Sequence, residues 1–216
     1  MPQTRMPPPL PARPELEDLS RAATSGAERQ PIATTVVDDS ASSDVLRLSS
    51  IDSFAASALL SRHGLVLEYV SDGAPIPGSY WGESEAGVIG NTVYARADTP
   101  VHSLLHEAAH LVVLSPERRA AVHTDATDSI DEEDAVCILQ ALLGDALPGV
   151  GCARVLADMD AWGYTFRLGS AAAYFEHDAD SAWQWLAARG LVDPETRSLC
   201  QSIAVHTGRS TQSATA

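Results

Sequence analysis

Apolar residues recur at helical spacing where the patterned part of the chain begins. Within residues 51–63 they stand at 51, 54, 55, 58 and 59, the spacing of one helical face. Ser50 can cap the start of this helix and Gly64 its end. The run from Leu65 to Val70 is typical of a strand and closes on Ser-Asp-Gly. The pattern therefore predicts a helix followed by a strand.

The order of the remaining elements indicates the fold class. Residues 87–96 predict a second strand, in which Gly90-Asn91 forms either a bulge or a tight turn. Thr99-Pro100 then caps and opens a helix that reaches about Leu114. After a polar stretch, further helices are expected over residues 132–147, 152–162, 170–189 and 194–205. A helix, two strands and then helices predict an α+β fold with a small, mainly antiparallel sheet.

Both ends of the chain differ in composition from this patterned part. Seven of the 13 prolines lie within the first 31 residues, so residues 1–45 are predicted to be a disordered Pro-rich leader. Residues 207–216 have the composition of a second tail, which leaves residues 46–206 as the folded domain. No secretory apolar segment and no apolar run of about 18 residues occurs, so a cytoplasmic protein is expected.

Charge and cysteine content exclude several classes of partner and site. The net charge is −15, and all 14 basic residues are arginines. Nucleic-acid binding requires clustered cations, so neither nucleic acid nor a membrane is expected as a partner. Three cysteines without a C-x-x-C pair argue against a disulfide framework and against a cysteine-based zinc site. The oligomeric state is not indicated.

The motif that carries chemistry is His106-Glu107-Ala108-Ala109-His110. Two histidines at positions i and i+4 lie one helical turn apart, so both imidazoles can reach one Zn²⁺. Glu107 lies beside them and can act as the general base for a metal-bound water. The helix is otherwise apolar, and polar side chains buried in it need partners, which a metal would supply.

A catalytic zinc needs a third protein ligand. The metzincin extension is excluded, because Val113 and Pro116 stand where glycine and histidine would be required. The gluzincin arrangement, a glutamate from a later helix, is available in Glu132 and Glu133. Glu132 is favoured because it lies on the apolar stripe of its helix, while Glu133 shares a mixed face with Cys137 and Gln140. Glu133 stays open as the alternative ligand.

This pattern resembles the ImmA/IrrE family of small bacterial gluzincin metallopeptidases. The resemblance rests on His106-Glu107-x-x-His110 and on Glu132-x-x-Ala135 followed by Leu142-Leu143, and it covers about residues 50–147. It implies a minimal zincin-like domain, Zn²⁺ held by His106, His110 and Glu132, Glu107 as base and a protein substrate. The helical part from about residue 150 has no counterpart in it.

The sequence therefore predicts a zinc-dependent metallopeptidase that hydrolyses a protein or peptide substrate. Tyr164 and His123 are candidates for an oxyanion or substrate contact, with Arg167 and His177 as further candidates by residue type. Residues 87–96 are a candidate edge strand for an extended peptide. The alternatives are a non-enzymatic zinc-stabilised interaction module and a hydrolase of a non-peptide amide.

Overall fold

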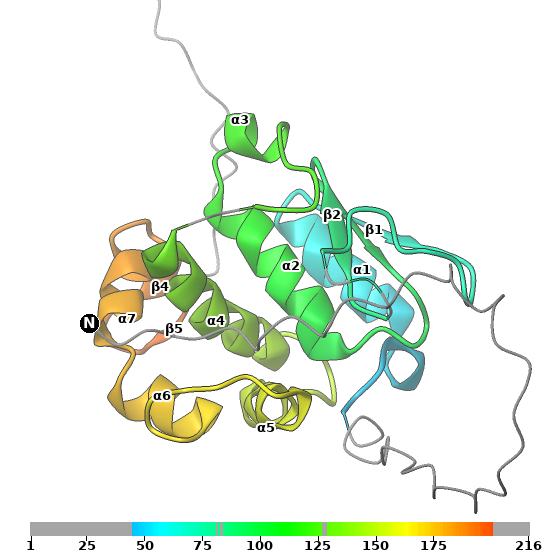
Figure 1. Ribbon diagram of the computed structural model, residues 1–216. Coiled ribbons are helices and arrows are strands. Elements are labelled where there is room, and N and C mark those ends of the chain that lie inside the picture. Colours follow the sequence, from blue (N-terminus) through cyan, green and yellow to red (C-terminus); the bar gives the residue numbers. More distant parts are fainter. Residues whose placement is uncertain (1–44, 81, 83, 127–128, 201–216) are drawn as a thin grey trace, which may run out of the picture.

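The computed structural model describes residues 45–80, 82, 84–126 and 129–200 (Figure 1). The expected tail over residues 207–216 lies outside these residues, as does all but the last residue of the expected leader over residues 1–45. Seven α-helices, a three-stranded sheet and a two-stranded sheet occupy the described residues, which confirms the α+β class. None of these helices has both the length and the apolar character that crossing a membrane requires.

The first helix, α1 (Ser53–Arg62), begins slightly later than its apolar pattern. Asp52 caps it, because the Asp52 carboxylate accepts a hydrogen bond from the backbone N–H of Phe54 at 2.9 Å. Ser50 instead ends a short 3-10 turn, η2 (Leu48–Ser50). Gly64 follows the helix with φ 71°, a left-handed conformation that glycine adopts without strain.

The three-stranded sheet is mixed rather than mainly antiparallel. Its strands are β1 (Val66–Tyr69), β2 (Gly87–Ile89) and β3 (Thr92–Ala95), in the order β1-β3-β2. A tight turn at Gly90-Asn91 joins β2 and β3 as an antiparallel hairpin, whereas β1 pairs with β3 in parallel. The expectation was wrong because the strand that follows β1 in the chain, β2, does not pair with β1. It forms the far edge of the sheet and leaves the position beside β1 to β3. The hairpin then places β3 beside β1 in the same direction.

The outer edge of β2 is already occupied by the chain itself. The N–H of Val88 donates to the carbonyl of Gly78 at 3.2 Å, and the carbonyl of Val88 accepts from the N–H of Thr124 at 3.0 Å. A Cβ atom added at Gly87 would lie 2.2 Å from the backbone nitrogen of Ser79, so this covering segment is in close contact. The expectation that residues 87–96 offer a free edge to a peptide is therefore wrong for β2.

Two buried helices form the centre of the molecule. Figure 1 shows α2 (Val101–Val113) and α4 (Ile130–Asp145) side by side, and α2 packs against α4 more extensively than against any other described element. Ser129 caps α4 by accepting from the N–H of Glu132. Thr99 does not cap α2 as expected, because its hydroxyl accepts from the N–H of Arg96 and closes the preceding turn. A short helix, α3 (Pro116–Arg119), occupies part of the expected polar connection.

The helices after α4 follow the expected order until the last one. Helix α5 (Cys152–Trp162) has the expected bounds, and residues 170–189 divide into α6 (Ala171–His177) and α7 (Asp180–Ala187). These helices enclose one cluster of buried apolar side chains together with the sheet and with α1, α2 and α4. The cluster includes residues from Leu48 to Val192.

The helix expected over residues 194–205 is wrong over its described part. A two-stranded hairpin of β4 (Val192–Asp193) and β5 (Ser198–Leu199) stands there instead. The carboxylate of Asp193 accepts from the N–H groups of Glu195 and Thr196, which turns the chain before a helix can begin.

Candidate metal centre

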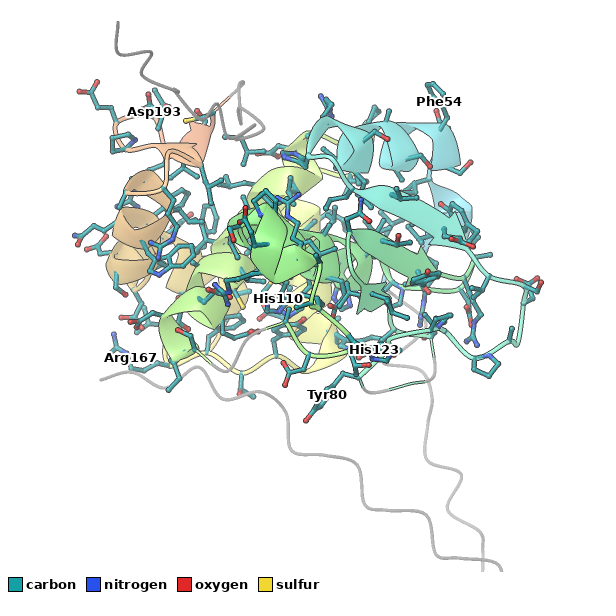
Figure 2. All side chains as sticks on the ribbon, turned by 90° about the horizontal axis from the view of Figure 1, so that it is seen from above. Phe54, Tyr80, His110, His123, Arg167 and Asp193 are labelled. Atoms are coloured by element: carbon teal, nitrogen blue, oxygen red, sulfur yellow. The ribbon has the colours of Figure 1, made fainter. Side chains whose placement is uncertain are left out.

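Helix α2 places the two histidines of the motif on one buried face. His106 and His110 are each 7 % exposed, and their rings are nearly perpendicular, with centroids 4.7 Å apart. Their Nε2 atoms lie 3.1 Å from each other, so both lone-pair positions converge on the same point. Figure 2 shows His110 near the middle of the molecule.

Helix α4 brings the carboxylate of Glu133 against both rings. Oε1 of Glu133 lies 3.3 Å from Nε2 of His106, and Oε2 lies 3.4 Å from Nε2 of His110. Ligand atoms bound to one tetrahedral Zn²⁺ at about 2.0–2.1 Å are separated by about 3.3 Å. The buried Oε1 atom of Glu133 makes no hydrogen bond of ordinary geometry with the described residues, so a cation would satisfy it. These separations and this donor set fit a metal ion.

Glu132 points elsewhere, so the structure reverses the preference between the two glutamates. Its carboxylate is bound by both terminal nitrogens of Arg118, at 3.1 and 3.3 Å. Glu132 is buried, as expected, but its carboxylate binds Arg118 and not the histidines. Adjacent helical residues project about 100° apart, so only one of the two glutamates can face α2. The mixed face of α4, which carries Glu133, is the one turned towards His106 and His110.

Gln140 holds the other nitrogen of His106. The side-chain oxygen of Gln140 lies 2.5 Å from Nδ1 of His106, and Gln140 is fully buried. A carbonyl oxygen only accepts, so Nδ1 of His106 carries the proton and Nε2 is left free for a cation. The sequence interpretation missed this residue, although a glutamine seven positions after Glu133, on the same helical face, was the available signal.

Cys137 lies one helical turn after Glu133 on the same side of α4. The ligand atoms of His106, Glu133 and Cys137 all lie within 4.8 Å of one another, so this buried group could hold a metal ion. All three cysteines of the described residues are free thiols. The sequence interpretation excluded cysteine ligands because no C-x-x-C pair occurs, and it missed a single cysteine spaced i, i+4 from a glutamate.

The charges around the histidine pair favour a cation at this position. Burial lowers the pKa of His106, but Glu133, with smaller contributions from Glu107 and Gln140, outweighs burial and raises the pKa to about 9. Burial and the neighbouring His106 lower the pKa of His110 to about 3, so the second ring is neutral. In the absence of a metal, one proton therefore takes the position between the rings and Glu133.

Glu107 is half-buried beside this pair. Its pKa is raised to about 7 in total. Burial contributes most to the rise, the charge of His106 opposes it, and the carboxylates of Glu133, Glu85 and Asp125 add to it. A carboxylate with a pKa near neutrality is well matched to accept and return a proton at physiological pH.

An aromatic wall formed by Trp162 at the end of α5 and by Tyr164 just after it completes the surroundings. The ring of Tyr164 lies 6.1 Å from that of His106, and burial together with nearby acids raises the pKa of Tyr164 well above its usual range. Trp162 donates its Nε1–H to Oε1 of Glu85 at 2.8 Å, which holds that carboxylate near Glu107. Glu85 was not recognised in the sequence, where it lies in a loop without any motif.

The other candidates are not brought to the histidine pair. His123 is exposed, and its ring contacts Thr124. Arg167 forms an ion pair with Asp178, and His177 is exposed beside Glu176. Figure 2 shows Arg167 at the side of the molecule, away from His110. Of the four residues proposed for an oxyanion or substrate contact, Tyr164 is the one with a ring contact to His106 among the described residues.

His102 does not line the mouth of the site, although it lies one turn before His106. It is 1 % exposed and packs between the rings of Trp162 and Tyr164, at centroid distances of 5.4 and 5.9 Å. Burial lowers its pKa to about 3, so it is a neutral part of the aromatic wall.

Comparison with known proteins gives no significant match: no protein-family model matches the chain, and no curated protein or solved structure is significantly similar to it.

Proposed function

We propose that this chain is a zinc-dependent metallopeptidase in which His106, His110 and Glu133 hold the ion. The observation that carries the proposal is the convergence of two imidazole Nε2 atoms and one carboxylate at separations of 3.1–3.4 Å, with a half-buried glutamate as the next residue. The two histidines and Glu107 occur in the spacing that zinc peptidases use for metal binding and proton transfer.

When bound, Zn²⁺ supplies Lewis acidity, which acidifies water and polarises a scissile carbonyl. Glu107 accepts the proton of the attacking water and returns it to the leaving amine. Gln140 keeps the Nε2 atom of His106 directed at the ion, and Tyr164 donates its phenolic hydrogen to the oxygen that becomes negative. The raised pKa of Tyr164 keeps that hydrogen in place at neutral pH.

The resemblance to the ImmA/IrrE peptidases supports a protein substrate and rests on the two sequence motifs alone. Within it, the ligand expected at Glu132 moves to Glu133. The three free cysteines of the described residues support a reducing compartment such as the cytoplasm.

The test compares the metal content and cleavage profile of wild type, Glu107→Gln and His106→Ala. We expect Glu107→Gln to retain zinc and to lower kcat/KM by at least about 100-fold, because removal of a general base typically loses 10²- to 10⁴-fold. His106→Ala is expected to lose the metal. Glu68→Gln, on the exposed strand β1, is the matched control and should change neither quantity.

Two outcomes separate this proposal from its rival, a non-enzymatic module stabilised by zinc. That module is favoured by one observation, the presence of Cys137 as a fourth donor beside the ion site, since structural zinc has four protein ligands. Zinc content without any cleavage that depends on Glu107 would support the module. If the purified wild-type protein contains no zinc and His106→Ala is as stable as wild type, both the peptidase and the module are contradicted.

Tyr164→Phe tests the second oxyanion donor. Loss of one such donor typically lowers kcat by about 10²- to 10³-fold, and we expect this range with an unchanged metal content. Phe166→Leu, in the same aromatic stack, is the control for altered packing. If Tyr164→Phe retains full kcat, the phenolic hydrogen has no part in the reaction.

A further inference from the structure

We propose that Cys137 is a fourth, displaceable ligand, so that its thiolate closes the metal site in the resting protein. This inference builds on the proposed function, because it concerns the coordination position that hydrolysis needs open. Its first measurement is independent of activity.

The geometry places the sulfur beside the two donors that are central to the site. His106 and Glu133 contact His110 on one side, and the same two residues form a compact group with Cys137. Cys137 is on the same helix as Glu133, one turn later, so the backbone of α4 fixes the spacing between them. The cysteine therefore shares two of the three proposed donors. His110 does not belong to the same compact group, so all four donors converge on one ion only when the Cys137 side chain or the ion shifts within the site.

The surroundings favour sulfur as a ligand. Cys137 is 3 % exposed, so its sulfur is almost completely shielded from solvent. Zinc accepts thiolate readily, at about 2.3 Å, and a coordinated thiol is deprotonated. On closure one Zn–S bond forms and the thiol proton passes to solvent. On opening the Zn–S bond breaks, the sulfur regains a proton, and no change of oxidation state is involved.

Closure has a definite consequence for the reaction. Two histidines, Glu133 and Cys137 make four protein ligands, the number that a structural zinc site has, whereas a catalytic zinc keeps one position for water. A substrate must therefore displace the sulfur before Glu107 can act. Removal of the sulfur should increase hydrolysis, whereas loss of any of the other three ligands should abolish it.

The experiment uses Co²⁺ as a spectroscopic probe in the full-length, metal-depleted protein. Co²⁺ bound to thiolate shows a charge-transfer band in the near ultraviolet, and tetrahedral Co²⁺ shows separate visible bands. We expect both in wild type, and only the visible bands in Cys137→Ser and Cys137→Ala. Cys152→Ser should keep both, since the half-buried Cys152 lies outside the ligand group.

Visible bands without a thiolate band in wild type would overturn the proposal. So would a thiolate band that persists in Cys137→Ala. X-ray absorption of the wild-type zinc protein needs no variant and remains informative if both substitutions prevent folding. A sulfur neighbour at about 2.3 Å is expected, and a shell of nitrogen and oxygen alone at about 2.0–2.1 Å would refute Cys137 as a ligand.

The activity arm separates this inference from the proposed function. Cys137→Ala is expected to raise kcat/KM several-fold, and an unchanged or lower value would contradict closure of the site by sulfur. Absence of hydrolysis in both wild type and Cys137→Ala would count against the peptidase itself. The sulfur coordination would then describe a four-ligand structural site.

Discussion

Gln140 is the residue on which the orientation of His106 depends. It is buried, and its carbonyl oxygen is the acceptor for the Nδ1–H of the ring. Metal-binding histidines are commonly held in this way by a second contact on the opposite nitrogen, which fixes both the tautomer and the ring plane. The histidine spacing was recognisable in the sequence, but this contact crosses 34 residues and depends on how α2 and α4 pack.

Replacement of Gln140 should weaken metal binding without removing a ligand. We expect Gln140→Leu, which has a similar volume and no acceptor, to lower zinc affinity by about 10- to 100-fold. Gln140→Glu keeps an acceptor for the Nδ1–H and should retain wild-type affinity or bind more tightly. Competition with a chelator measures both variants. Equal affinities for wild type and Gln140→Leu would show that the ring needs no such support.

At the scale of elements, α4 has two faces with different partners, and the position of its apolar residues alone does not reveal which face lies against the histidines. Its apolar stripe includes Glu132, which is neutralised by Arg118 from the short helix α3. The neighbouring face carries Glu133, Cys137 and Gln140, and all three contact the histidine region. Polar residues spaced i, i+4 and i+7 on a buried helix were therefore the better indicator of the site than the apolar stripe.

The two glutamates should respond differently to the same substitution. Glu133→Gln is expected to lower zinc affinity by more than about 100-fold. Loss of a residue that only supports a ligand already lowers metal affinity by about 10- to 100-fold, and this substitution removes a ligand itself. Glu132→Gln should keep zinc and reduce the free energy of unfolding by about 1 kcal/mol, because it weakens one ion pair with a half-exposed arginine. Metal analysis and chemical denaturation check the pair. Retention of zinc in Glu133→Gln with its loss in Glu132→Gln would restore the original assignment.

At the scale of the whole molecule, the site joins two helices that are separated by 16 residues of the chain. Its proposed ligand atoms come from α2 and α4, the two helices at the centre of the core. An ion bound between them stabilises the folded chain, because the unfolded chain does not hold these donors together.

Metal removal should therefore lower the melting temperature. At a free zinc concentration 100-fold above Kd the expected stabilisation is about 2.7 kcal/mol, or about 5–10 °C in Tm for a chain of this size. Calorimetry of the metal-free and zinc-loaded protein measures the difference. His106→Ala serves as the control, since its Tm should not respond to zinc. An equal response in wild type and His106→Ala would place the stabilising zinc elsewhere.

The increase in Tm that zinc produces should become larger as the pH rises. In the metal-free protein the pKa of His106 is raised from 6.5 to about 9, so its proton contributes stability that is fully present below pH 6.5. That contribution is lost as the pH rises through about 9. Zinc must displace the same proton, so it binds more tightly as the pH rises over this range. The difference in Tm should be larger at pH 8.5 than at pH 6.5, and a pH-independent difference would contradict proton displacement.

The sequence alone determined those features that depend on local spacing. Helical periodicity located α1, α2, α4 and α5, and the i, i+4 histidines with their intervening glutamate were sufficient to identify the candidate site. These features involve residues within one or two helical turns, whose relative positions follow from helix geometry.

Only the tertiary structure decided which residues complete the site. The rotation of α4 against α2 selects Glu133 over Glu132 and brings in Cys137 and Gln140, and the loop before β2 places Glu85 beside Glu107. The covered edge of β2 and the parallel pairing of β1 likewise depend on where distant segments return. Such contacts are set by packing between elements, for which the spacing of residues within one element carries no information.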